Sequence, residues 1–160
     1  MIITFDKVPA TLDEFKALPE ASLEKPEYAM ALFILAMLNY KTDTDLAVSQ
    51  INYLRGPVNP LSNADLSFIK DRMQGGDNVP KSYFKGATPD NAYTPDQPLT
   101  IEITENSYSY AEENYAVLHC KSGGADSPRQ CKMRKGGDGK WYLWSQQVLV
   151  GIRDPKGFWA

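Results

Sequence analysis

Apolar residues in the first half of the chain recur at the three- and four-residue spacing of helices, between punctuating prolines and glycines. Thr11 and Glu14 form a capping-box motif that opens a short helix before Pro19. Pro26 suits the first turn of a second helix. The nearly unbroken apolar run over residues 28–38 predicts that this second helix is buried on most sides and forms the centre of the core.

Two more helices are expected before the pattern changes. One begins within residues 42–45 and ends at Gly56, which is followed by proline. The other has Ser62 as its cap and Asp65 at the third helical position, and Leu61 can pack on Leu66 across the cap. The glycine pair at residues 75–76 closes it.

The second half of the chain alternates apolar and polar residues with the two-residue period of half-buried strands. This alternation covers residues 99–104, 115–121 and 130–135, and it resumes at 140–144 after a glycine-rich turn at 136–139. We therefore expect an α+β fold, in which an N-terminal four-helix segment packs on a C-terminal antiparallel β-sheet with the order of a meander.

A long irregular segment, residues 77–98, joins the two halves; it holds four prolines and has no period. Segments of this length are uncommon inside compact domains and are often functional or linkers. Its three aromatic side chains favour packing onto the rest of the protein. We expect a single domain over residues 1–160, made of a helical half (1–76), this ordered loop and a sheet half (99–160).

Composition excludes several classes of function. The chain of 160 residues is 42% hydrophobic and 23% charged, which is typical of soluble globular proteins. One histidine and two cysteines are too few for a His-based zinc site, a Cys₄ cluster or a C₂H₂ finger, so we expect neither metal nor cofactor. The start lacks the pattern of a signal peptide, and the longest apolar run is about half of the roughly 20 residues that cross a membrane. We expect a cytoplasmic protein without membrane contact.

The formal charge of −3 is unevenly distributed. Residues 1–115 carry 9 basic and 17 acidic side chains, a net −8, whereas residues 116–160 carry 8 and 3, a net +5. The asymmetry can steer an anionic ligand or partner to the sheet half, but basic residues that guard a sheet against edge pairing produce it equally well. Nucleic acid is an unexpected partner for an acidic chain; a weaker hypothesis of such binding rests on Arg129, Lys132, Arg134, Lys135 and Lys140.

The two cysteines lie on neighbouring strands of the expected sheet. If the intervening hairpin turns about Ala125 and Asp126, Cys120 lies opposite Cys131, and a cross-strand disulfide can form provided that the pair occupies a non-hydrogen-bonded site. In a cytoplasmic protein we expect two packed thiols instead. His119 and Cys120 are adjacent on a strand and point to opposite faces, which excludes them as a nucleophilic pair.

The connection at residues 122–129 is the most suggestive candidate for binding. Its two glycines let successive N–H groups converge on an anion, Ser122 adds a hydroxyl, and Arg129 can hold a carboxylate or phosphate. A plain hairpin connection explains the same residues, with Asp126 as a turn former.

The long loop supplies a second set of candidates. Asp90, Asn91 and Tyr93 suit the recognition of a polar ligand at the rim of a cleft. An Ω-like segment that is pinned by its aromatic side chains is the alternative.

Three parts of the chain together resemble a known family. They read SYFKGATPDN at residues 82–91, SGGADSPR at residues 122–129, and KWYLW at 140–144 followed by GIRDP at 151–155. With these segments the chain resembles an uncharacterised domain family, a domain of unknown function, of Gram-positive bacteria. The resemblance implies no activity, cofactor or catalytic residue.

Without a catalytic signature, the sequence favours a non-enzymatic binding or protein-interaction module. It would use the sheet face and the loops at residues 79–98 and 122–129 to bind a protein partner or a small polar or anionic ligand. The alternative is an enzyme of an unrecognised type, with a polar cleft near Asp90, Tyr93, Asp126 and Arg129.

Overall fold

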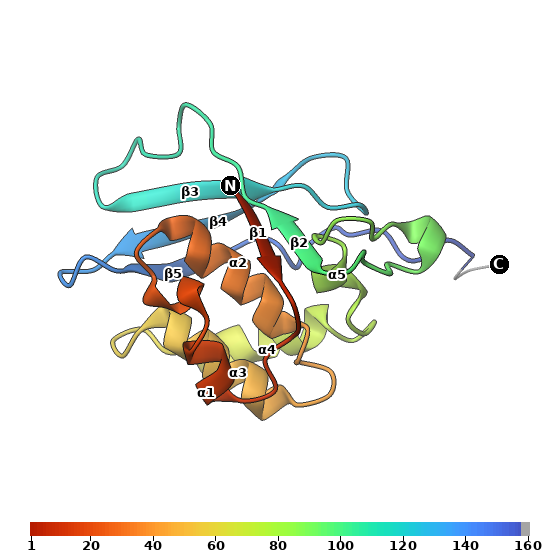
Figure 1. Cartoon of the computed structure of the whole chain (residues 1–160), viewed down its shortest axis with the longest axis horizontal. Coiled ribbons are helices and arrows are strands. Elements are labelled where there is room, and N and C mark those ends of the chain that lie inside the picture. The colour runs from red at the N-terminus through yellow and green to blue at the C-terminus, as the bar shows by residue number, and fades with distance from the viewer. Residues whose placement is uncertain (158–160) are drawn as a thin grey trace.

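A computed structural model describes residues 1–157 and confirms that the fold is α+β (Figure 1). Its helices are α1 (Leu12–Lys16), α2 (Pro26–Met37), α3 (Thr44–Arg55), α4 (Asn63–Arg72) and the single turn α5 (Asn78–Lys81). Its strands are β1 (Ile2–Phe5), β2 (Leu99–Glu102), β3 (Tyr115–Cys120), β4 (Arg129–Lys135) and β5 (Trp141–Gln146). Two short 3₁₀ helices cover Pro19–Ser22 and Pro89–Asn91.

The first four helices lie where their local signals predict them. Thr11 accepts a hydrogen bond from the N–H of Glu14 at 3.0 Å, which caps α1. Asp43 caps α3 through its carboxylate. The capping box of α4 is complete, because Ser62 accepts from the N–H of Asp65 at 3.1 Å and the Asp65 carboxylate accepts from the N–H of Ser62 at 2.9 Å.

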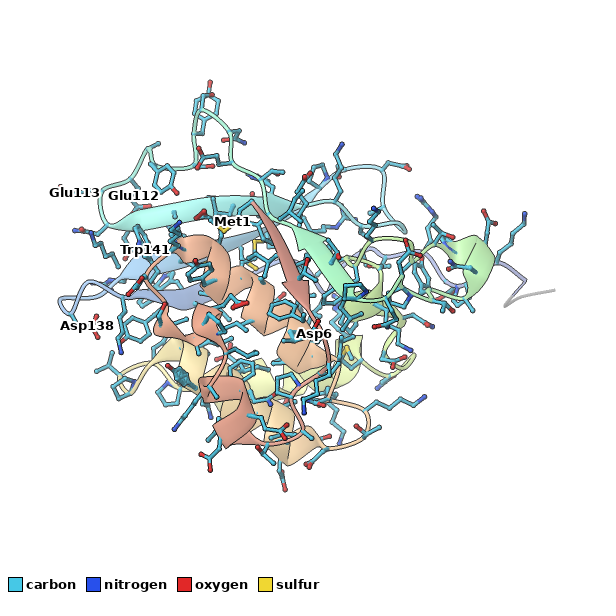
Figure 2. All side chains as sticks on the ribbon, viewed as in Figure 1. Met1, Asp6, Glu112, Glu113, Asp138 and Trp141 are labelled. Carbon is cyan, nitrogen blue, oxygen red and sulfur yellow. The ribbon has the colours of Figure 1, made fainter. Side chains whose placement is uncertain are left out.

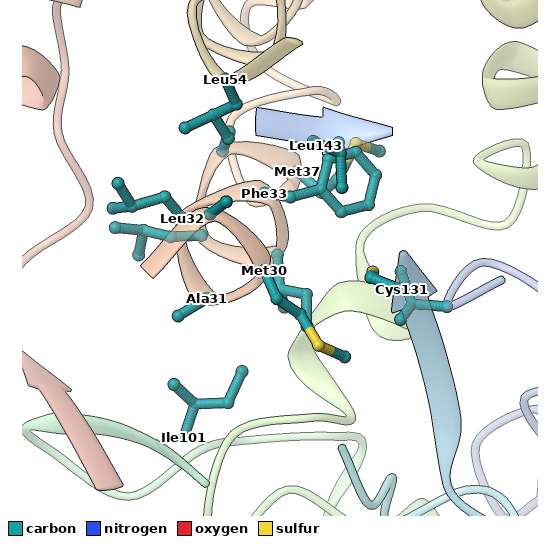
Figure 3. Packing of buried hydrophobic residues seen from close by; sticks show 14 of the residues in the cluster. Met30, Ala31, Leu32, Phe33, Met37, Leu54, Ile101, Cys131 and Leu143 are labelled. Atoms are coloured by element: carbon teal, nitrogen blue, oxygen red, sulfur yellow. The ribbon is translucent and has the colours of Figure 1, made fainter. Parts of the chain in front are cut away.

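Helix α2 forms the centre of the core, as its apolar sequence predicts. Ten of its twelve residues are buried. Phe33 and Met37 lie beside Leu143 of β5, and Leu54 of α3 lies on another side of the helix (Figure 3). Because a fully buried leucine, isoleucine, phenylalanine or methionine side chain contributes roughly 1.5–3 kcal/mol, packing around α2 contributes strongly to stability.

The sheet half differs from the expected single meander. β3, β4 and β5 form a three-stranded antiparallel meander, but β2 pairs instead with β1, with Ile3 opposite Ile101 and Phe5 opposite Leu99. The expectation that residues 99–104 belong to the C-terminal meander is therefore wrong. The four residues of β1 are too few for their alternation to identify a strand, although Ile3 and Phe5 are both buried.

The register of the first hairpin also differs from the expected one. Cys120 pairs with Arg129, and Cys131 pairs with Leu118, so the two cysteines do not lie opposite each other. The hairpin is centred between Gly124 and Ala125, one residue earlier than expected, which moves each pairing by two positions. A two-residue shift keeps every side chain on its own face. Both cysteines accordingly remain in the core as free thiols.

The loop at residues 77–98 is more structured than its sequence predicts. It contains α5 and the 3₁₀ helix Pro89–Asn91. Tyr83, Phe84 and Tyr93 are buried, as the aromatic residues of the loop predict.

Candidate functional site

The sequence-predicted residue Arg129 holds the last described segment of the chain. Its guanidinium donates to the carbonyl oxygens of Val150 and Gly151 at 2.8 and 2.9 Å. It also donates to the carbonyl and hydroxyl oxygens of Ser127 at 2.9 and 3.0 Å. Four of the five N–H donors of this side chain are therefore used within the protein.

Three other predicted residues contact the same C-terminal segment. The Tyr93 hydroxyl donates to the carbonyl oxygen of Arg153, and the Asp126 carboxylate forms an ion pair with the Arg153 side chain at 3.0 Å. Asp90 lies 3.4 Å from the ammonium of Lys156. These residues fasten the C-terminal segment to the two loops, and their role toward a ligand stays a prediction.

Asn91 and Ser122, the remaining candidates, bond within the loops themselves. The amide of Asn91 donates to the carbonyl oxygens of Gly86 and Thr94 at 2.7 and 3.2 Å. The Ser122 hydroxyl donates to the hydroxyl of Ser82 at 2.7 Å, and both serines are buried. Ser122 thus ties the connection between β3 and β4 to the long loop.

The N–H groups of the glycine pair have partners inside the protein. The N–H of Gly123 donates to the Ser82 carbonyl at 2.8 Å, and that of Gly124 donates to the Ser122 hydroxyl at 3.0 Å. The N–H of Ala125 donates to the Ser122 carbonyl at 3.4 Å. In this structure these groups do not converge on an anion site.

A gap in the sheet appears on the outer edge of β2. Met1 and Ile103 exchange both of their backbone hydrogen bonds, at 2.6 and 2.9 Å. In an antiparallel ladder the residues beside such a pair direct their N–H and C=O groups to the other edge. The backbone of Glu102 is therefore directed away from β1 and toward β3.

β2 and β3 are joined by a single bridge, where Thr104 and His119 exchange hydrogen bonds of 2.8 and 2.9 Å. A continued ladder would next pair Glu102 with Lys121. No backbone hydrogen bond joins these two positions within the described chain. From the bridge onward the two strands diverge (Figure 1).

Residues 82–85 occupy the space between the diverging strands. The N–H of Lys85 donates to the carbonyl oxygen of Thr100 on β2 at 2.8 Å. On the other side, the Ser82 carbonyl accepts from the N–H of Gly123, which follows β3, at 2.8 Å. The inserted segment holds the two strands apart at Glu102 and Lys121.

The divergence leaves a cleft of about 620 Å³ on the sheet. Its deep side is lined by buried Tyr83, Phe84 and Cys120. Its rim consists of the polar side chains of Lys85, Thr88, Thr100, Glu102, Thr104 and Lys121, with exposed Ile2 beside them. Ligand pockets commonly have this volume, with an apolar lining and a few polar groups.

A family model described as a domain of unknown function, DUF6935, matches residues 7–156. The chain belongs to this family. No curated protein and no solved structure matches the chain. Membership of DUF6935 confirms the resemblance to a domain of unknown function.

Burial determines the protonation state of Cys120, the cysteine that lines the cleft of this DUF6935 member. The pKa of Cys120 is raised to about 12, chiefly because burial disfavours the thiolate and further because the Glu102 carboxylate repels its charge. Burial likewise raises the pKa of the Tyr83 hydroxyl. The deep side of the cleft is therefore uncharged at neutral pH, and its charges lie on the rim.

Of the six residues that the sequence suggested for the DUF6935 chain, Ser122 alone lines the cleft. Glu102, Lys85 and Lys121 were missed, because in the sequence they are ordinary polar positions of strands and loops. The one sequence feature that could have indicated the cleft is Gly123, two residues after Lys121. Only a residue without a side chain allows the loop at residues 82–88 to approach this position.

Residues 1–157 of this DUF6935 chain offer neither a membrane-spanning helix nor a cluster of metal ligands. In this part of the chain every helix is too short or too polar to cross a membrane. Nor do the described histidine, cysteine, aspartate and glutamate side chains come together in groups of three or more that could hold a metal ion.

Proposed function

We propose that the protein is a non-enzymatic binding module, and that the cleft between β2 and β3 holds a small polar ligand. The interrupted pairing of Glu102 with Lys121 is the observation that carries this proposal. It opens hydrogen-bonding backbone next to a pocket with an apolar deep side, and a ligand can satisfy both features together.

The rim suggests the chemistry of the ligand. Lys85 and Lys121 suit a carboxylate, while Glu102 suits an ammonium or amide N–H. The apolar deep side suits an aliphatic group. A free amino acid or a short peptide with an aliphatic side chain combines these three features.

Binding rather than turnover is supported by the state of the nucleophilic side chains in the cleft. The raised pKa of Cys120 keeps its thiol protonated at neutral pH, and a thiol is a weak nucleophile. The Ser122 hydroxyl is bonded to Ser82, whose own hydroxyl donates to the Val79 carbonyl at 2.7 Å. This chain of bonds ends on a backbone oxygen rather than on a general base.

The proposal is tested with two matched variants and NMR titration. Thr100→Phe places a bulky ring in the cleft, whereas Thr4→Phe makes the same change at the residue directly opposite on β1, which does not line it. Both changes keep good strand-forming residues. The probes are leucine, glycyl-leucine and N-acetyl-leucine amide.

We expect leucine or glycyl-leucine to shift the backbone amide signals of Glu102 and Lys121 in the wild-type protein and in Thr4→Phe, but not in Thr100→Phe. Weaker binding of N-acetyl-leucine amide, which has no charge, would support the role of the rim charges. Unchanged amide signals with all three probes at millimolar concentration would refute the proposal.

On the sequence alone, we also propose that the protein is cytoplasmic and comes from a Gram-positive bacterium. Cell fractionation of the source organism tests the first, and a Gram stain of that organism tests the second.

A further inference from the structure

Arg134 of β4 packs against two aromatic side chains at the end of the sheet that lies opposite the cleft. Its Cζ is 4.9 Å from the ring centroid of Trp144 and 5.6 Å from that of Tyr115, which lies directly opposite it on β3. The two rings are 6.1 Å apart in an edge-to-face arrangement. Contact with both rings restricts the orientation of the guanidinium.

Arg134 differs from the other arginines of residues 1–157 in its polar contacts. Each of the others has an internal partner: Arg55 bonds to Asn59 and Asp65, Arg72 to Asp71, Arg129 to Ser127, Val150 and Gly151, and Arg153 to Asp126. Arg134 has neither an ion pair nor a hydrogen bond with a described residue. Its donors are therefore available in a restricted orientation, which is the state that favours bidentate binding of an oxyanion.

Arg134 lines a second cleft of about 420 Å³, between β4, β5 and the loop after α3. The next residue of β4, Lys135, points to the other face of the sheet, where its ammonium lies 5.9 Å from the ring of Trp141, its partner on β5. The opposite wall is apolar: Pro57 and Val58 line it, and Val58 is 92% exposed. Arg134 thus shares this cleft with an exposed apolar side chain.

Two carboxylates lie near Arg134, Asp138 in the lining of the same cleft and Glu112, and both have other partners in the protein. Asp138 accepts from the Tyr142 hydroxyl at 2.5 Å and from the N–H of Lys140 at 3.0 Å, and these bonds lower its pKa. Glu112 forms an ion pair with Lys132 at 2.8 Å. Figure 2 shows Glu112 and Asp138 at the same end of the sheet. The guanidinium of Arg134 is thus left for a carboxylate from outside.

We propose that the second cleft is the docking site for an acidic segment of a partner protein. A glutamate or aspartate of the partner binds the guanidinium of Arg134, and a neighbouring aliphatic residue packs on Val58 and Trp144. Charge complementarity supports this occupant, because residues 116–160 carry a net +5. A protein is favoured over nucleic acid, since the remaining residues carry −8 and would repel a polyanion.

Fluorescence anisotropy with a labelled peptide of alternating glutamate and leucine tests the proposal. The comparison peptide has glutamine in place of each glutamate, and a twelve-nucleotide oligothymidine represents nucleic acid. Arg134→Gln removes the charge, and Arg134→Lys keeps the charge without the planar fork. Lys140→Gln is the matched control, because it removes one charge from the same hairpin outside the cleft.

We expect the acidic peptide to bind and Arg134→Gln to weaken binding at least tenfold, with a smaller loss in Arg134→Lys and less than a twofold change in Lys140→Gln. Thr100→Phe, which fills the first cleft, leaves this binding unchanged. The proposal is overturned if the glutamine peptide or the oligothymidine binds as tightly, if Arg134→Gln binds normally, or if the protein self-associates through this surface.

Discussion

The Cα of Gly123 lies so close to the carbonyl oxygen of Ala87 that a Cβ on Gly123 would overlap it. This contact brings the connection between β3 and β4 against the loop that enters the gap in the sheet. Because the obstructing atom belongs to the backbone, a side chain at Gly123 can be accommodated only if one of the two loops moves.

Gly123→Ala is therefore expected to lower the free energy of unfolding by about 1–3 kcal/mol. Gly137→Ala is the control, because a Cβ there has no heavy atom within 4 Å; its effect should stay within about 0.5 kcal/mol. Urea unfolding followed by circular dichroism measures both. Equal stabilities of the two variants would show that the loops do not hold each other in this way.

Arg129→Gln should release the C-terminal segment. The change removes hydrogen bonds to Val150 and Gly151, and we expect a loss of about 1–3 kcal/mol in the free energy of unfolding. Hydrogen exchange should accelerate first at residues 148–156. Arg134→Gln, on the same strand, serves as the control, since that arginine makes no such bonds; similar exchange in both variants would contradict the role of Arg129.

Both thiols should resist modification in the folded protein. Burial raises the pKa values of Cys120, to about 12, and of Cys131. At pH 8 we expect a disulfide reagent such as DTNB to react with two thiols in guanidinium but with almost none in the native state. Fast reaction of the native protein would show that the core opens at β3 or β4.

The same thiols predict a loss of stability in alkali. Because the pKa of each thiol is higher in the folded protein, the unfolded chain loses its thiol protons at lower pH than the folded protein does. The free energy of unfolding is therefore unaffected by the thiols below about pH 9, and it decreases as the pH rises toward the folded-state pKa. Guanidinium unfolding between pH 7 and 10.5 should reveal this decline. Cys131→Val, which cannot ionise, should flatten it; an unaltered slope would assign the decline to other groups.

Asp65 predicts a loss of stability in acid. Its hydrogen bonds with Ser62, assisted by the charge of Arg55, lower the pKa of Asp65, so its contribution is present above about pH 4 and is lost as pH falls further. Asp65→Asn should cost about 1 kcal/mol at pH 7 and reduce the pH dependence below pH 5. Asp71→Asn, in the last turn of the same helix and 68% exposed, should change neither.

The helices could be predicted because their signals are local. The caps at Thr11, Asp43 and Ser62 and the apolar run of α2 operate within a few residues of each other along the chain. The pairing of β2 with β1 could not be predicted, since partner choice joins positions about a hundred residues apart and the alternation of β1 covers only four residues. The predicted pairing of Cys120 with Cys131 was wrong because the centre of the turn lies one residue earlier than expected.

The cleft was beyond the reach of the sequence for a different reason. Glu102 and Lys121 become neighbours across a gap only because residues 82–85 enter the sheet. Tyr93, Asp126 and Arg129 have the side chains of a binding site, but they bond to a C-terminal segment whose position no local pattern indicates. Chemistry-bearing residues could be found from the sequence, but their partners could not.

The single bridge between Thr104 and His119 links the proposed binding to the cohesion of the whole sheet. A ligand that bonds to the backbones of Glu102 and Lys121 would supply the hydrogen bonds that β2 and β3 do not make with each other there. The two sheets would then unfold together rather than separately. Amide exchange at Thr104 and His119 should then slow as the cleft fills, because a ligand of the native state stabilises it by mass action. The two sheets would in this sense become one cooperative unit only when the proposed ligand is bound.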